Sequence, residues 1–184
     1  MADATLLPFD FRSFYKTVNG YASELSTLLD QMRENTALSN QLIKENHYGY
    51  AGDPTVTLLP PPVKEEVPYL DFSPLQNALH TLEKATNRLA DTLEKQKQGS
   101  AVSDAVNQAL YKAEQQLLSD NGLPRRPWYR HAIYAPGFYT GYGVKTLPGI
   151  REAIEQRNWK EAQEQIGIAA AVLKKFAAYL DGID

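Results

Sequence analysis

Apolar residues recur at alternating steps of three and four along the first part of the chain, which places them on one side of a helix. The residues with this spacing are Phe11, Phe14, Val18, Tyr21, Leu25, Leu28 and Met32. Asp10 comes directly before them and can accept hydrogen bonds from the first backbone N–H groups. The pattern therefore predicts a helix that begins after Asp10 and continues to about residue 32.

The same spacing predicts two further helices in the middle of the chain and a short and a long one near its end. They are expected over residues 73–98, 102–119, 148–157 and 159–180. Ser73 and Asn158 each begin a capping box, a pattern typical of helix N-termini. Long helices of similar length with matching apolar stripes are typical of a bundle. The predicted fold class is all-α, a left-handed antiparallel four-helix bundle.

Residues 33–70 interrupt this pattern. They begin with polar, helix-compatible sequence and continue with five prolines and two glycines between Tyr48 and Tyr69. Such composition predicts an extended, polyproline-like crossover. A connection this long is either partly disordered or lies along a surface. Apolar residues favour the second alternative, and these are Val56, Leu58, Leu59 and Tyr69.

Residues 123–147 form a second irregular stretch, rich in aromatic residues. Its rings between residues 128 and 142 are Trp128, Tyr129, Tyr134, Phe138, Tyr139 and Tyr142. Interspersed prolines and glycines exclude a long helix, and so much aromatic area is costly to leave in water. We therefore expect an ordered loop held against the bundle. The arginines between the rings are interpreted as packing groups rather than as a platform for nucleic-acid bases.

The composition excludes several classes of protein. The chain has 184 residues, 43% of them hydrophobic, which is enough for a single domain with its own core. A net charge of -3 gives no footprint for nucleic acid or for an anionic membrane. No stretch is apolar enough for a membrane span, and the start lacks the pattern of a signal peptide. We expect either a cytosolic protein or a piece of a longer chain.

Candidate catalytic chemistry is scarce. There are no cysteines, so disulfides and thiolate metal sites are excluded. The three histidines, His47, His80 and His131, lie far apart in the sequence with no second ligand at helical spacing. Nucleophile elbows, P-loops and dinucleotide-binding glycine patterns are missing. We predict no catalytic residues and no metal site in this chain.

The aromatic stretch resembles the C-terminal segment of glutamate carboxypeptidase II and its relatives. The matching elements are Leu123-Pro124, Arg126-Pro127-Trp128-Tyr129-Arg130-His131, Ile133-Tyr134-Ala135-Pro136 and Leu147-Pro148-Gly149-Ile150. The first residues of the chain, through Phe11, look like the start of the same domain, and residues 70–93 are similar to its second helix. Only residues 33–69 fall outside the resemblance.

This resemblance implies a transferrin receptor-like dimerisation domain. In that family a helical bundle follows a zinc peptidase domain, and two full chains pair through the bundle. The zinc ligands and the general base lie in the peptidase domain, so we expect no cofactor here and an isolated domain that is not an enzyme. The expected partners are a second copy of the chain and the parent peptidase domain. The family also suggests an extracytoplasmic location.

The resemblance also suggests site residues. In the carboxypeptidase, a loop of this segment reaches the active site, where a lysine and a tyrosine contact the substrate's glutamate side chain. The tyrosine corresponds to Tyr142 and the lysine to Gly141, so the ammonium group is missing. Tyr142 could instead be a packed ring in a glycine-flanked turn, and Lys145 could compensate only through a different bend. Residues expected to anchor the loop are Trp128, Tyr129, Arg130, His131 and Tyr134.

Two other hypotheses fit the same residues. The chain could be a free-standing helical scaffold or adaptor that has kept the bundle without an enzyme. It could also belong to a receptor-like relative whose peptidase domain is catalytically dead. The coding sequence upstream of Met1 distinguishes these hypotheses from the first.

Overall fold

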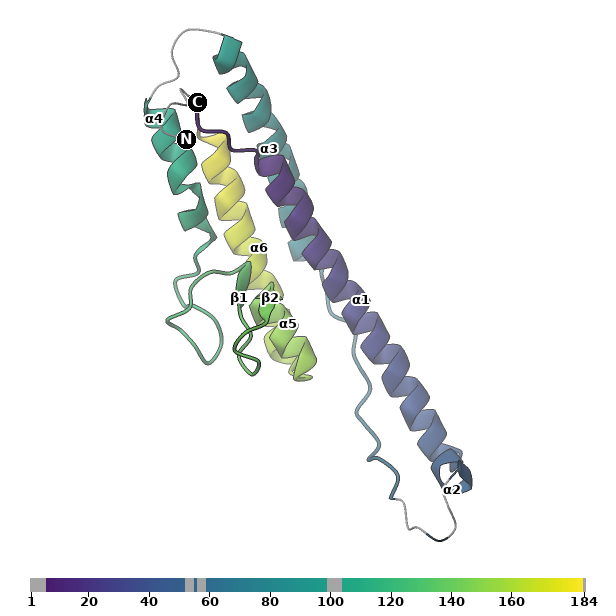
Figure 1. The fold of residues 1–184 in the computed structure, drawn as a ribbon. Helices are drawn as coiled ribbons and strands as arrows, with labels where there is room; N and C mark the ends of the chain where they lie inside the picture. Colours follow the sequence, from purple (N-terminus) through teal and green to yellow (C-terminus); the bar gives the residue numbers. More distant parts are fainter. Residues whose placement is uncertain (1–5, 52–54, 56–58, 99–103, 184) are drawn as a thin grey trace. The chain divides into compact units, whose positions relative to one another are not determined.

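The computed structural model describes residues 6–51, 55, 59–98 and 104–183, and its elements are labelled in Figure 1. In chain order they are α1 (Phe11–Lys44), α2 (His47–Ala51), α3 (Ser73–Gln98), α4 (Asp104–Lys112), the 3₁₀ helix η1 (Ala113–Leu117), β1 (Tyr134–Pro136), β2 (Val144–Thr146), α5 (Pro148–Glu155) and α6 (Trp159–Asp181). The structure is mostly helical, which confirms the predicted all-α class. Two compact units divide the chain, one of Met1–Ser23 with Leu70–Asp184 and the other of Glu24–Tyr69.

The first helix begins where the sequence predicts. The Asp10 carboxylate accepts a hydrogen bond from the backbone N–H of Arg12 at 3.0 Å, as an N-cap should. α1 continues to Lys44, well past the end predicted near residue 32. Residues 33–44 contain neither proline nor glycine, so nothing in them breaks a helix once its apolar stripe has ended.

The larger unit is built around α6. This helix packs against α3, α5 and η1. Phe11 and Phe14 of α1 meet Phe176 of α6 edge to face, with ring centroids 5.7 and 5.2 Å apart. Fully buried side chains of this unit include Leu75, Leu82, Leu110, Ile133, Ile150, Ile154, Ile166, Leu173 and Leu180. The apolar stripes predicted for these helices thus form one core.

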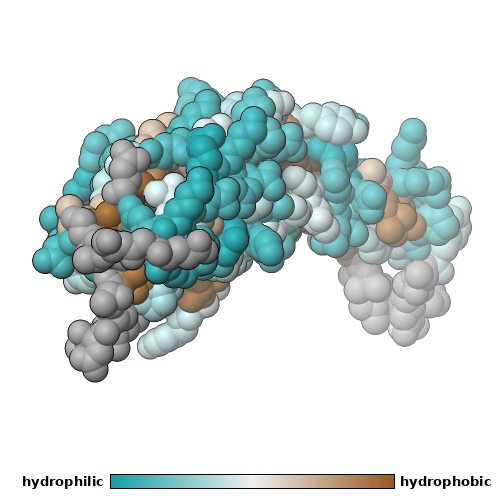
Figure 2. All heavy atoms as spheres, turned by 90° about the horizontal axis from the view of Figure 1, so that it is seen from above, coloured by the Kyte–Doolittle hydropathy of each residue, from teal (hydrophilic) through white to brown (hydrophobic). Residues whose placement is uncertain are grey.

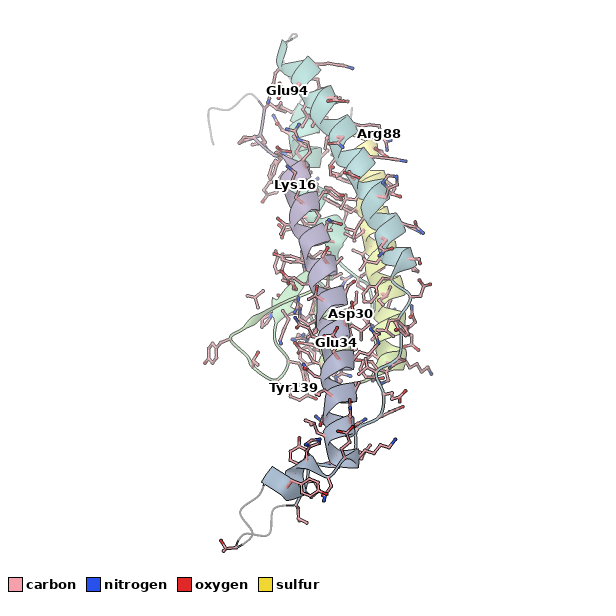
Figure 3. The ribbon with its side chains drawn as sticks, turned by 90° about the vertical axis from the view of Figure 1, so that its right-hand side faces the viewer. Lys16, Asp30, Glu34, Arg88, Glu94 and Tyr139 are labelled. Carbon is pink, nitrogen blue, oxygen red and sulfur yellow. The ribbon has the colours of Figure 1, made fainter. Side chains whose placement is uncertain are left out.

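Polar contacts at the surface of this unit also join helices. Arg88 on α3 lies next to α6 in Figure 3 and binds both carboxylate oxygens of Asp181 at 2.6 and 2.8 Å. The hydroxyl of Tyr179 donates to the carbonyl of Ala109 in α4 at 3.0 Å. Each contact fixes the position of one helix along its neighbour.

The helix predicted over residues 102–119 differs in the structure. Val102 lies outside the described residues, α4 ends at Lys112, and η1 continues to Leu117. Leu118 is extended and forms a bridge with His131. The helix ends early because Leu118 pairs with residues 123–147, which we call the aromatic segment. A 3₁₀ turn is common at the end of an α-helix.

The two helices near the C-terminus match their predictions closely. Pro148 opens α5 after Leu147, which has a left-handed backbone conformation with a φ of 46°. The side chain of Asn158 accepts the N–H of Glu161 at 3.3 Å and caps α6 as the sequence predicts. The starts of α5 and α6 are therefore determined by residues at their own N-termini.

The smaller unit joins the second part of α1 to an extended segment, residues 59–69, which we call the strap. The side chain of Asn40 bonds to both backbone groups of Lys64, at 2.8 and 3.0 Å. Arg33 donates to the carbonyls of Val67 and Pro68, and its guanidinium lies 3.9 Å from the ring centroid of Tyr69.

The spacing of these contacts has a simple basis. Arg33 and Asn40 are two helical turns apart, a rise of about 10 Å. An extended polyproline-like chain covers a similar length over the strap residues they hold, at about 3.1 Å per residue. Val67 is buried, whereas Leu59 and Tyr69 are exposed, so the polar contacts of Arg33 and Asn40 hold the strap together with Val67. Val56 and Leu58 lie outside the described residues.

Candidate functional site

The aromatic segment ends in a β-hairpin that the sequence did not predict. β1 and β2 pair in antiparallel fashion, with Tyr134 opposite Thr146 and Pro136 opposite Val144. Residues 137–143 form the tip, and the N–H of Gly137 donates to the carbonyl of Gly143 at 2.8 Å. Gly141 has a φ of 66°, a conformation that residues with a side chain adopt at a cost. The glycines thus allow the sharp turn that carries Tyr142.

A buried ion pair holds the base of this hairpin. Arg126 donates through Nη2 to both carboxylate oxygens of Glu152 in α5, at 2.7 and 2.8 Å. The two residues are only 6% and 3% exposed. Arg126 also donates through Nη1 to the carbonyl of Pro136. Arg126 and Glu152 therefore tie the aromatic segment and the hairpin to α5.

Glu152 extends this network toward the tip. Its Oε1 accepts the backbone N–H of Phe138 at 2.9 Å, directly after the end of β1. The guanidinium of Arg126 lies 5.8 Å from the ring centroid of Phe138 and 5.9 Å from that of Tyr129. The interpretation of this arginine as a packing group agrees with these contacts.

More exposed ion pairs support the same region. Arg125 binds both oxygens of Glu161 in α6 at 2.8 and 2.9 Å. Lys145 of β2 binds both oxygens of Glu155 in α5 at 2.7 and 2.9 Å. The ammonium group of Lys145 is thus directed to α5 and not to the tip.

A polar cluster joins the start of β1 to η1. The Tyr134 hydroxyl donates to Oε1 of Glu114 at 2.6 Å, and this bond raises the pKa of Tyr134 to about 12. Nδ1 of His131 accepts the N–H groups of Ile133 and Tyr134, both at 3.3 Å. Burial lowers the pKa of His131, although Glu114 opposes this effect. The imidazole is therefore neutral at pH 7.

The predicted anchoring residues lie in different environments. Tyr129 and His131 are half-buried, and Tyr134 bonds to Glu114. Arg130 is exposed but donates through Nε to the carbonyl of Ser119 at 3.1 Å. Trp128 is largely exposed and so is not among the buried contacts. The residues that the sequence analysis missed are Arg126, as an ion-pairing anchor, and Glu152. In the sequence, the pair is indicated only by the opposite charges of Arg126 in the aromatic segment and Glu152 in the helix that follows it.

The two residues expected at the substrate lie at the tip. Tyr142 is fully exposed, at 102% of its reference area, and Gly141 has no atom within 4 Å of the position of an added Cβ. Tyr139, labelled in Figure 3, belongs to the same tip and is also exposed. The aromatic area that was expected to pack on the bundle thus remains largely in solvent. The segment is held by its ion pairs and by Leu123, Ile133 and Leu147 instead.

The described residues contain neither a metal-binding cluster nor a helix that could span a membrane. No group of three or more His, Cys, Asp or Glu side chains is placed to hold a metal ion among them. Of the helices in the described part of the chain, none combines the length and apolar character that crossing a membrane requires.

Residues 70–181 match the family model of the transferrin receptor-like dimerisation domain. The chain belongs to this family. The match covers α3 through α6, and therefore the aromatic segment, the hairpin and the ion pair that holds it. The resemblance to this family is confirmed over these residues, while the part that involves the first residues of the chain lies outside the match.

Two relatives of the chain are named "Probable glutamate carboxypeptidase". One, from Arabidopsis thaliana, is 31% identical over 121 residues, which are 61% of this chain and 18% of the relative. The other, from Arthroderma benhamiae, is 30% identical over 116 residues, 61% of this chain and 16% of the relative. A "Putative zinc metalloprotease" from Saccharomyces cerevisiae is 34% identical over 80 residues, 39% of this chain and 10% of the relative. The chain thus spans less than a fifth of the length of each.

Proposed function

We propose that this chain is the non-catalytic dimerisation domain of a larger zinc-dependent peptidase of the glutamate carboxypeptidase type, and that its hairpin tip enters the substrate pocket of that enzyme. One contrast carries the proposal. The base of the hairpin is fixed by the buried pair of Arg126 and Glu152, while Tyr142 at the tip is fully exposed. A rigid base with an open aromatic tip suits a contact presented to another domain.

The helices provide the pairing part of the proposed function. We place the first part of α1 with α3, α4 and α6 in an antiparallel four-helix bundle, through which two copies pair. The contacts of Phe11 and Phe14 with Phe176 and the long packed interface of α3 with α6 support this arrangement. We assign the zinc ion and its ligands to the peptidase domain of the parent enzyme, and the yeast relative is named a "Putative zinc metalloprotease".

The tip also bears on the substrate preference of the parent enzyme. The phenol of Tyr142 can hydrogen-bond to a substrate carboxylate, but Gly141 provides no ammonium group beside it. Lys145 is already bound to Glu155 and cannot replace it without breaking that pair. A charge-assisted bond is about twice as strong as a neutral one. The parent therefore prefers a C-terminal glutamate less strongly than an enzyme with the lysine does.

Kinetics of the full-length parent test the role of the tip. Tyr142→Ala should raise KM for peptides with a C-terminal acidic residue, while Tyr50→Ala, the same truncation of an exposed ring in α2, should not. Gly141→Lys should increase kcat/KM for glutamate over leucine at the C-terminus by roughly tenfold, as expected for one restored charge-assisted contact. Unchanged kinetics in both Tyr142→Ala and Gly141→Lys would contradict the proposed role.

The isolated chain provides a complementary test. It should hydrolyse no peptide, with or without added zinc, because the proposal assigns all catalytic groups to the other domain. Hydrolysis that copurifies with the chain and is abolished by a chelator would contradict the assignment.

A further inference from the structure

An open, mainly apolar groove of about 370 Å³ lies in the larger unit, on a different part of it from the hairpin tip. Its inner wall consists of Phe11 and Phe14 from the start of α1, Phe176 from α6, and Leu110 and Leu117 from α4 and η1. Rings meeting edge to face form this wall, so its shape is fixed by the core itself. The groove is therefore a built feature of the unit.

Exposed aromatic rings form the rim of the groove. Phe9, Tyr111 and Tyr134 all line it, and Tyr111 is 70% exposed. Phe9 stacks on Phe11 with centroids 5.7 Å apart, which continues the inner wall outward. The face shown in Figure 2 is mostly hydrophilic with separate hydrophobic patches. Apolar residues gathered around a hollow in such a surface are typical of a binding site for another molecule.

The charge of the lining is one-sided. Two of the lining residues, Asp10 and Glu114, are acidic, and none is basic. Asp10 is already paired with Arg12, at 2.9 Å between Oδ1 and Nε. Glu114 uses Oε1 to accept the Tyr134 hydroxyl, and among the described residues nothing bonds to its Oε2. His131, whose Nε2 is 3.8 Å from the carboxylate, is kept neutral by burial. One carboxylate oxygen thus remains for a ligand at the edge of an aromatic wall.

We propose that this groove binds a segment of a partner polypeptide in which a lysine or arginine lies next to a large apolar side chain. The aliphatic part of the basic side chain would cover the rings, and its cationic end would reach Glu114. The neighbouring apolar side chain would occupy the remaining volume between Phe14 and Leu110.

The observations favour this occupant over two others. In a two-fold contact with a second copy the same patch meets itself, which would bring the acidic lining residues of both copies together. An enclosed pocket for a small molecule would cover most of its ligand, whereas the rim of this groove is open. The inference does not depend on the proposed role of the hairpin, because neither Tyr142 nor the ion pair at its base lines the groove.

Titration of the purified chain with two short peptides tests the proposal. The probes are acetyl-Gly-Lys-Phe-Gly-amide and the same peptide with glutamine in place of lysine, followed through the methyl NMR signals of Leu110 and Leu117. The lysine peptide should shift these signals and bind about threefold more tightly, as expected for an ion pair at an exposed carboxylate. Glu114→Gln, which retains an acceptor for Tyr134, should remove this difference. Tyr111→Ala should weaken both peptides.

Glu164→Gln removes an exposed carboxylate of α6 that does not line the groove, and it should leave both affinities unchanged. Equal binding of the two peptides, shifts confined to other residues, or an unaltered preference in Glu114→Gln would each overturn the proposal. So would self-association of the chain that Glu114→Gln abolishes, since the occupant would then be a second copy. Tighter binding of benzylammonium than of the lysine peptide would identify a small-molecule site and also overturn it.

Discussion

At the residue scale, the aromatic segment is positioned by charges more than by its rings. Removing an arginine and a glutamate from water is costly, and only well-made hydrogen bonds offset the cost. Here Glu152 accepts from Arg126 and from the N–H of Phe138, and Arg126 also reaches the carbonyl of Pro136. The pair therefore also bonds to two backbone groups of the hairpin, the N–H of Phe138 and the carbonyl of Pro136.

Glu152→Gln should lower the free energy of unfolding by about 3 to 5 kcal/mol, because it leaves the buried charge of Arg126 without a counterion. Urea denaturation followed by circular dichroism measures the change. Glu94→Gln is the control, since Glu94 forms an exposed pair with Lys97 that solvent screens and that contributes little to stability. A loss in Glu152→Gln as small as in the control would show that the pair does not hold the fold.

His131 should make stability depend on pH. Burial lowers its pKa in the folded chain below the ordinary value of 6.5. Below pH 6.5 the unfolded chain therefore binds more protons than the folded chain. His131 does not lower the free energy of unfolding above pH 6.5, but it lowers this free energy as the pH decreases below that value. The free energy of unfolding should therefore be lower at pH 5.5 than at pH 7.5.

Replacement of two histidines separates this effect from others. His131→Gln should reduce the difference between the two pH values, since glutamine can still accept the backbone N–H groups without titrating. His80→Gln, at an exposed position on α3, should leave it unchanged. Identical pH dependence in all three proteins would assign the effect to other groups.

At the scale of elements, the sequence predicted those helix starts that depend on a neighbouring capping residue. Asp10 and Asn158 accept the N–H groups that their sequence positions suggest, and so the starts of α1 and α6 were predicted. The end of α1 was missed because an apolar stripe can stop while its helix continues. The hairpin was missed because its strands have three residues each and their pairing is set by distant contacts with α5.

Two glycines in the aromatic segment should respond differently to substitution. Gly122 and Gly141 both have positive φ values, so alanine is strained at either position by about 1 to 2 kcal/mol. An added Cβ at Gly122 would lie 2.1 Å from the carbonyl oxygen of Pro127, whereas at Gly141 it would meet nothing within 4 Å. Gly122→Ala should therefore destabilise the chain clearly more than Gly141→Ala, as measured by thermal unfolding. Equal losses would mean that the turn at Gly122 can shift.

At the scale of the whole molecule, the family match and the division into units nearly coincide. The match covers residues 70–181, and the smaller unit, Glu24–Tyr69, precedes it. That unit buries few apolar side chains of the strap and holds it through Arg33 and Asn40 instead. Few buried contacts make a segment unable to offset much conformational entropy by itself. The family function should therefore reside in the larger unit.

Sedimentation of two forms of the chain tests this assignment. The intact chain, 20.6 kDa, should show a weight-average mass that approaches twice this value as its concentration rises. A variant in which residues 24–69 are replaced by a glycine-serine linker should still pair, because every residue of the family match remains. Circular dichroism would first establish that the variant keeps its remaining helices. A folded but monomeric variant beside a dimeric intact chain would move the pairing surface into residues 24–69, against the expectation from the family.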